Sequence, residues 1–275
     1  KRIEELFIDV FGNYHLVCKD STYQFVLSEK LVQLNVISTK VFNDNIKNIV
    51  YNDSERIVAS VFSNHNKAFR LIKRSYKSEH ENIVHTIVDL EAVKQAAKFY
   101  NYIIALYNAA IPSEQNIIIN GVWDGNLAHL AARDDGTLIQ AITWYRNVVS
   151  RKVNVRAFPH NDSIIVFDFD NRTIETLDYN GTPFKQIDIQ ASLKMDYFEM
   201  LHDSITDNYF CYDPTKPTIE LYQIDLNSGE LIPCLTLDGV RYPKKPKVFN
   251  GWLYFIDLND ASFNKLYRAN INLKQ

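Results

Sequence analysis

The stretch TIETLDYNG at residues 173–181 has a near copy in TIELYQIDLNSG at residues 218–229. Both begin with Thr-Ile-Glu, alternate apolar with polar residues, and close with Asp, Asn and Gly in that order. Alternation with a period of two is typical of a half-buried β-strand, and the closing residues are typical of a tight turn. The second copy starts 45 residues after the first, which is the length of a whole supersecondary unit.

The repeat extends beyond this hairpin. An apolar stretch precedes each copy, SIIVFDFD from residue 163 and NYFCYD from residue 208, and a third such stretch, WLYFID, starts at residue 252. The starts are therefore 45 and 44 residues apart. Similar stretches begin at Tyr14 and Arg56, and a further short strand precedes each of the five. The pattern predicts units of four antiparallel strands, each about 44 residues long.

A four-stranded sheet cannot bury both of its faces alone, but sheets arranged around an axis cover one another. We therefore predict an all-β protein, with residues 1–275 forming a single β-propeller domain. The expected number of blades is six, with seven as the alternative. Residues 91–150 form the irregular or enlarged part of this scheme: residues 91–100 favour a short helix, whereas residues 101–108 and 116–145 favour strands.

The last unit stops after its third strand. We expect a strand near or before Lys1 to supply the missing fourth strand; otherwise the last blade has three strands. In the second strands of the blades, five side chains are expected to be buried: Ile164, Val166, Phe210, Tyr254 and Ile256.

The hairpins IIVFDFDNRTIETLDYNG (164–181) and LYFIDLNDASFNKLYRANI (253–271) resemble those of six-bladed, TolB-like β-propellers. More narrowly, they are similar to uncharacterised bacterial extracytoplasmic propellers, many of which are lipoproteins. The resemblance implies an exported binding or scaffold protein in the periplasm or at the cell surface, with the cytoplasm as the alternative. It implies no catalytic residue.

The charge and the apolar runs of the chain limit the kinds of partner that we expect. The formal net charge of −3 gives no electrostatic basis for binding nucleic acid or an anionic membrane. No apolar run approaches the roughly 20 residues that span a bilayer, although a lipid anchor upstream of Lys1 would be compatible with the sequence. Cys18, Cys211 and Cys234 lie far apart in apolar runs, so we expect small buried thiols, with one disulfide as the alternative.

Aspartates gather in the connections between second and third strands. They are Asp20, Asp168, Asp170, Asp213, Asp257 and Asp260, with Asp134 and Asp135 in the irregular part. A ring of carboxylates could hold Ca²⁺, but aspartate also starts tight turns through bonds to the backbone. We expect each to serve its own turn, and we expect no metal site and no cofactor.

Two places favour ligand contact. RYPKKPK (241–247) is expected in the last connection between blades. There a basic patch suited to an anionic group is formed by Arg241, Lys244, Lys245 and Lys247, with Tyr242 and two prolines beside them. Trp123 lies in the turn-rich stretch GVWDGN, where an exposed indole could stack on a ligand. A solvated loop is the simpler interpretation of the lysine run.

No sequence motif of a nucleophile, a metal centre or a phosphate loop is present. The preferred function is therefore non-enzymatic binding of a protein, small molecule or carbohydrate on the propeller face that carries these connections. The alternative is a hydrolase or lyase that acts on a carbohydrate or lactone at the mouth of the axial channel. A deep pocket with converging acidic or imidazole groups would favour the enzyme, and a mixed surface would favour binding.

Overall fold

The computed structural model of the chain describes residues 3–27, 30–63, 67–77, 80–109, 143–144, 151, 153–191, 198–240, 243–257 and 265–271. The chain divides into two compact units. The first comprises Lys1–Val61, Leu71–His85 and Asn154–Gln275, and the second comprises Phe62–Arg70 and Thr86–Val153.

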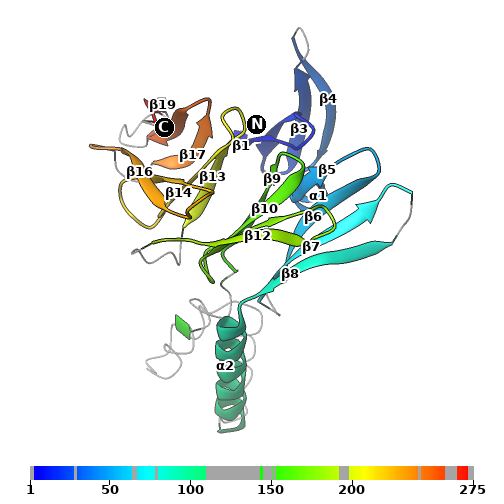
Figure 1. Cartoon of the computed structure of the whole chain (residues 1–275), viewed down its shortest axis with the longest axis vertical. Helices are drawn as coiled ribbons and strands as arrows, with labels where there is room; N and C mark the ends of the chain where they lie inside the picture. Colours follow the sequence, from blue (N-terminus) through cyan, green and yellow to red (C-terminus); the bar gives the residue numbers. More distant parts are fainter. Residues whose placement is uncertain are drawn as a thin grey trace. The chain divides into compact units, whose positions relative to one another are not determined.

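The strands form five antiparallel sheets, which are the blades of a β-propeller (Figure 1). Blade 1 contains β1 (Ile3–Ile8), β2 (Tyr14–Cys18), β3 (Ser21–Leu27) and β4 (Leu31–Ser38). The short helix α1 (Thr39–Asn45) leads to blade 2, with β5 (Ile49–Asn52), β6 (Arg56–Ser63), β7 (Ala68–Ser75) and β8 (Glu81–Val88). Blade 3 contains β9 (Val155–His160), β10 (Ser163–Asp168), β11 (Thr173–Leu177) and β12 (Pro183–Asp188). Blade 4 contains β13 (Glu199–Asp203), β14 (Asn208–Tyr212), β15 (Glu220–Ile224) and β16 (Leu231–Thr236). Blade 5 contains β17 (Lys244–Phe249), β18 (Trp252–Asp257) and β19 (Lys265–Asn270).

The predicted β-propeller with four-stranded antiparallel blades is confirmed, but the expected count of six or seven blades is wrong: the described residues form five. The difference arises after β8, where a 20-residue helix, α2 (Leu90–Ala109), replaces the strand expected at residues 101–108. The helix expected at residues 91–100 is confirmed as its first half. Residues 116–142 lie outside the described residues.

The start of α2 has a local cause. Asp89 precedes the helix, and its Oδ1 accepts the backbone N–H of Ala92 at 2.8 Å, which satisfies one of the free donors of the first turn. Within the same unit, Phe99 is buried and its ring meets that of Trp144 edge to face, 5.6 Å between centroids. Among the described residues, no helix is both long and apolar enough to cross a membrane.

Blade 4 shows how one strand serves two interfaces. Side chains alternate between the two faces of a strand, and both faces of β14 are buried. Tyr209 and Cys211 join an apolar cluster with Ile165 and Phe167 of blade 3. Phe210, between them, joins a second cluster with Leu253 of blade 5. A strand covered on both faces is apolar throughout, which explains why these stretches do not alternate.

The glycines that close the two repeated hairpins lie at interfaces between blades. Gly181 and Gly229 have φ of +83° and +75°, a region that side chains rarely adopt. A Cβ at Gly181 would overlap the carbonyl oxygen of Val84 at the fourth strand of blade 2, and a Cβ at Gly229 would overlap that of Asp188 at the fourth strand of blade 3. The repeated Gly therefore allows each turn to approach the backbone of the preceding blade.

Of the five expected core residues, Ile164, Val166 and Phe210 are fully buried in second strands, as predicted. Tyr254 and Ile256 lie in the second strand β18 but are only half-buried. Their neighbours Leu253 and Phe255 point to blade 4 instead, so the period of two places Tyr254 and Ile256 on the other face.

The strand expected to complete the last blade is not β1. β1 pairs with β2 as the first strand of blade 1, and in the described residues blade 5 has three strands, which was the stated alternative. Blades 1 and 5 still approach each other, because Glu5 Oε1 on β1 lies 3.6 Å from Lys247 Nζ on β17.

The three cysteines are buried and free, so the thiol prediction is confirmed and the disulfide alternative is wrong. Burial raises the pKa of Cys211 strongly, and it raises the pKa of Cys234 to about 11. Both side chains therefore behave as small apolar residues at neutral pH.

We expect Gly229→Ala to destabilise the propeller by at least ~1 kcal/mol more than Gly12→Ala. Both glycines have positive φ, so both substitutions strain the backbone. A Cβ at Gly12 would meet nothing within 4 Å. The difference between the two variants therefore measures the contact between blades. Urea unfolding followed by circular dichroism measures the difference. Equal losses would show that the close approach to Asp188 carries no energy.

We expect Ile164→Ala to lower the free energy of unfolding by roughly 2–5 kcal/mol, because it opens a cavity in a filled interface. Phe184→Ala on β12 is the control, since its side chain is 65% exposed and should cost about 0.5 kcal/mol or less. A loss below about 1 kcal/mol for Ile164→Ala would contradict the packing described for blade 3.

Candidate functional site

A cavity of about 500 Å³ lies where blades 1, 4 and 5 meet. The starts of three first strands line it, with Glu4 and Glu5 from β1, Glu199–Leu201 from β13 and Lys244–Lys247 from β17. The end of β14 and the connection from β14 to β15 supply Tyr212, Asp213, Pro214, Lys216 and Ile219, and Pro243 lines the cavity just before β17. The cavity therefore lies on the propeller face that carries the second-to-third strand connections.

The lysine side of the cavity is shaped by an irregular strand. The pairing of β17 with β18 shifts between Lys244 and Lys247, so β17 carries a bulge there. Lys245 has φ of +53° inside this bulge. Pro243 and Pro246 flank it, and proline is tolerated at bulges because no ladder hydrogen bond is lost. Lys244 and Lys245 are exposed.

The acidic side begins with Glu5. Its carboxylate binds Lys47 Nζ at 2.5 Å and lies 3.6 Å from Lys247 Nζ. Burial alone would raise the pKa of Glu5, but the hydrogen bond and charge of Lys47, with those of Lys247, outweigh burial and lower it. Glu5 is therefore an ionised carboxylate whose charge is already neutralised by lysines.

Glu199 and Tyr212 form a second pair in the cavity. The Tyr212 hydroxyl donates to Glu199 Oε2 at 2.7 Å. Burial, together with the neighbouring Glu199 carboxylate, raises the pKa of Tyr212 far above its ordinary value. Tyr212 is thus a neutral donor at physiological pH that fixes the direction of the Glu199 carboxylate.

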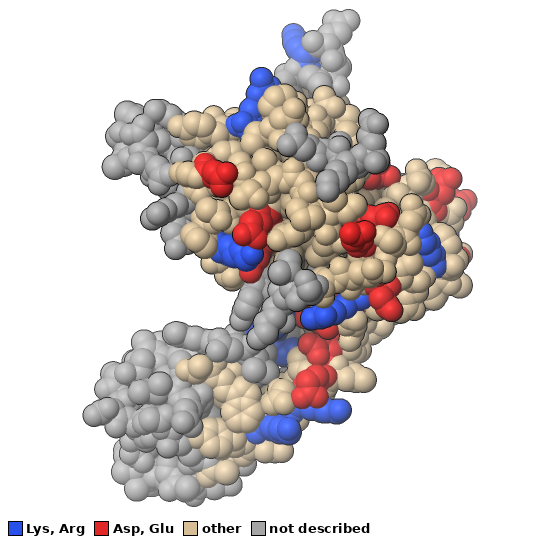
Figure 2. Space-filling view, turned by 60° about the vertical axis from the view of Figure 1, so that its left-hand side comes forward, with Lys and Arg blue, Asp and Glu red and all other residues tan. Residues whose placement is uncertain are grey.

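The remaining charged groups of the connection also have partners. Lys216 Nζ binds Glu220 Oε2 at 2.5 Å, and this hydrogen bond raises the pKa of Lys216. Asp213 accepts the backbone N–H and the hydroxyl of Thr215 at 2.8 and 2.6 Å. By contrast, no described carboxylate lies within ion-pair distance of Lys244 or Lys245. Figure 2 shows acidic and basic side chains interspersed on the face that it displays, without a large region of one sign.

Of the five candidate ligand-binding residues, the structure brings together Lys244 and Lys245, which line the cavity. They lie within β17 rather than in a connection between blades, so that part of the expectation is wrong. The bulge explains the error, because the prolines and lysines that it accommodates are also typical of a loop. Arg241, Tyr242 and Trp123 lie outside the described residues, and their role stays a prediction.

Two of the acidic turn residues form hydrogen bonds within their own turns, as expected. Asp168 accepts the backbone N–H of Asn171 at 3.0 Å, and Asp213 binds Thr215 as given above. Asp170 instead accepts the backbone N–H of Asn154 at 2.6 Å. Asp134, Asp135 and Asp260 lie outside the described residues. In the described residues, no group of three potential ligands from His, Cys, Asp and Glu could hold a metal ion.

Four residues that line the cavity were not predicted from the sequence: Glu4, Glu5, Glu199 and Tyr212. A signal exists for two of them: Glu4 and Glu5 interrupt the apolar alternation at the start of the first strand. Nothing in the sequence brings Glu199 beside them, because the contact depends on how blades 1, 4 and 5 meet.

No family model and no curated protein matches the chain. Solved structures similar to it include a Lactobacillus plantarum protein, at 11% identity and a TM-score of 0.30 over 86% of this chain. An acylaminoacyl peptidase has 13% identity and a TM-score of 0.40 over 99% of this chain. TolB from Acinetobacter baumannii has 10% identity and a TM-score of 0.28, and the match covers 95% of this chain and 66% of TolB. The chain spans 55% of the first of these proteins and 38% of the second. At this level of similarity they say nothing about the activity of this chain.

We expect Glu5→Gln to lower the free energy of unfolding at pH 7 by about 1 kcal/mol or less, because the partners of Glu5 are partly exposed. The pKa of Glu5 is lower in the folded than in the unfolded state. Its stabilising effect is therefore present above the unfolded pKa and is lost as the pH falls through the folded pKa. Denaturant unfolding from pH 7 to about 3 should show the difference between variant and parent shrinking.

Glu55→Gln is the control, since Glu55 is an exposed glutamate with no ion pair among the described residues. A pH-independent loss in Glu5→Gln would show that the two lysines do not act on Glu5 through its charge.

Proposed function

We propose that the chain is a non-enzymatic binding module whose cavity between blades 1, 4 and 5 takes a peptide-like ligand that carries both charges. The observation that supports this most is the mixed lining. The cavity presents four lysines and four carboxylates, Lys216, Lys244, Lys245, Lys247, Glu4, Glu5, Glu199 and Asp213. A ligand of one charge would meet repulsion from half of these groups.

Each part of such a ligand has a counterpart. Lys244 and Lys245 suit a carboxylate, because neither is already paired with a described acid. Met200, Leu201 and Ile219 supply an apolar surface for a side chain. The volume of about 500 Å³ is within the range of sites for small ligands. Glu199, oriented by Tyr212, suits an ammonium or amide donor.

The hydrolase or lyase alternative is less well supported by the same geometry. A carboxyl that acts as a general acid must lie within hydrogen-bond reach of the substrate atom to which it gives its proton. Here Glu5 is held by lysines, and Asp213 is bonded to its own turn. Binding of a ligand uses the lining as it stands, whereas catalysis by Glu5 or Asp213 would require these carboxylates to leave their present partners. An extracytoplasmic location remains part of this proposal.

The test measures binding by isothermal titration calorimetry. The probes are the unblocked tripeptides Lys-Leu-Glu and Gly-Leu-Gly and the uncharged, blocked amino acid acetyl-Leu-amide. We expect Lys-Leu-Glu to bind most tightly. The double variant Lys244→Gln/Lys245→Gln should weaken it about tenfold, which corresponds to ~1.4 kcal/mol. Lys77→Gln, an exposed lysine that does not line the cavity, is the matched control.

Two results would count against the proposal. One is equal affinity for Lys-Leu-Glu and acetyl-Leu-amide, because charge would then play no part. The other is an equal effect of Lys77→Gln, because the lysines of the cavity would then not be the site.

A further inference from the structure

Two histidines from neighbouring blades share one carboxylate at the interface between blades 3 and 4. His160, at the end of β9, has its Nδ1 3.0 Å from Oδ2 of Asp207. His202, on β13, has its Nε2 3.1 Å from Oδ1 of the same carboxylate. Asp207 lies in the turn between β13 and β14, so its bond to His160 connects the two blades. A neutral imidazole has one N–H to donate, and an ionised carboxylate can accept from both rings.

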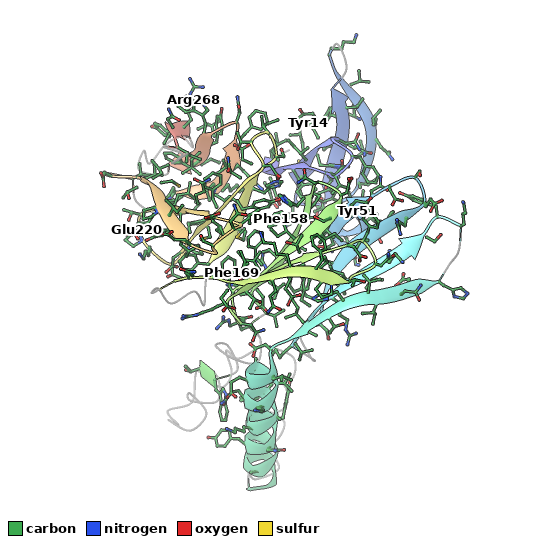
Figure 3. All side chains as sticks on the ribbon, viewed as in Figure 1. Tyr14, Tyr51, Phe158, Phe169, Glu220 and Arg268 are labelled. Atoms are coloured by element: carbon green, nitrogen blue, oxygen red, sulfur yellow. The ribbon has the colours of Figure 1, made fainter. Side chains whose placement is uncertain are left out.

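Aromatic rings enclose the two imidazoles. The Tyr209 ring stacks on His202, with 4.5 Å between centroids and 10° between planes. Phe158 of blade 3, labelled in Figure 3, places its ring 5.4 Å from His202. The side chains of His160 and His202 are 24% and 15% exposed, so a positive charge on either ring is poorly solvated. Asp207 is 43% exposed, which keeps the group accessible to protons from solvent.

The other titratable groups around the two rings have fixed states. Asp203 favours the charged form of His202, but its carboxylate already accepts two backbone N–H groups of blade 5. Burial, followed by the charge of Asp207, raises the pKa of Tyr209 far above its ordinary value, so its hydroxyl stays neutral. Asp162, in the turn after β9, is exposed to solvent. Asp207 is therefore the carboxylate that bonds to both imidazoles.

One carboxylate neutralises one imidazolium but not two. If both rings are protonated, one positive charge stays uncompensated in a half-buried interface. Burial lowers the pKa of His202, and nearby His160 lowers it further, although Asp207 acts in the opposite direction. The two imidazoles and the carboxylate therefore titrate as one coupled group, in which the second proton opposes the contact between blades.

We propose that His160, His202 and Asp207 form a pH-sensitive latch, which holds blades 3 and 4 together at neutral pH and opens when both imidazoles are protonated. The latch goes beyond the proposed binding function and does not rest on it. His202 binds a proton less readily in the folded than in the unfolded chain. The stabilising effect of the latch is therefore complete above the unfolded pKa of about 6.5 and is lost as the pH falls toward the lower folded pKa.

The first test follows the imidazole resonances by NMR during a pH titration. His160→Gln should raise the pKa of His202, because a neighbouring positive charge is removed. Asp207→Asn should lower it, because the carboxylate charge is removed, and asparagine also tolerates the φ of +52° at this position. His80→Gln is the matched control, since His80 is exposed and forms no ion pair within the described part of the chain.

The second test locates the opening by hydrogen exchange, corrected for the intrinsic dependence of exchange on pH. Residues 155–160 and 199–212 should exchange several-fold faster at about pH 5 than at about pH 7, because the latch is then open. Residues 252–257 of blade 5, where no histidine occurs, should change little. His202→Phe should remove the acceleration, because phenylalanine keeps a ring against Tyr209 but takes up no proton.

The proposal is overturned if the pKa of His202 is unchanged by His160→Gln, because the two imidazoles would then not be coupled. A shift of equal size in His80→Gln would overturn it as well. In the exchange experiment, two outcomes contradict it: acceleration that is equal in blade 5, which would indicate global unfolding, and acceleration that persists in His202→Phe.

Discussion

The contact between one blade and the next is the interaction on which the rest of this structure depends. A single blade exposes two apolar faces, and only a neighbour on each side removes both from water. In β14 this appears residue by residue: Tyr209 and Cys211 pack toward blade 3, and Phe210 packs toward blade 5. The stability of each blade is therefore largely the stability of its two interfaces.

Polar groups fix how the blades meet. Asp203, fully buried at the end of β13, accepts the backbone N–H groups of Asn250 and Gly251 from blade 5 at 3.0 and 2.7 Å. Burial would raise its pKa, but these hydrogen bonds outweigh burial and lower it. The Tyr209 hydroxyl in blade 4 lies 3.1 Å from the carbonyl oxygen of Pro159 in blade 3. Apolar packing supplies the energy of the interface, and these bonds determine its register.

The four-stranded blade could be predicted from the sequence because it is defined by a local pattern. The repeat of about 45 residues, the two-residue alternation and the turn glycines all act over short distances. The number of blades could not be predicted from the sequence. Residues 101–108 are apolar enough for a strand, but in the structure they continue α2. A short apolar run has no feature that separates a buried strand from a buried helix, and the context on either side decides.

The candidate site could be predicted only in part, for a related reason. Lys244 and Lys245 were found because they are adjacent in the sequence, whereas Glu5 and Glu199 become neighbours only when blades 1, 4 and 5 meet. The same constraint shapes the cavity. Blade 5 has blade 4 on one side, but it meets blade 1 through long polar side chains such as Lys247 and Glu5. An interface closed by charged side chains leaves space beside β17, and the cavity lies in that space.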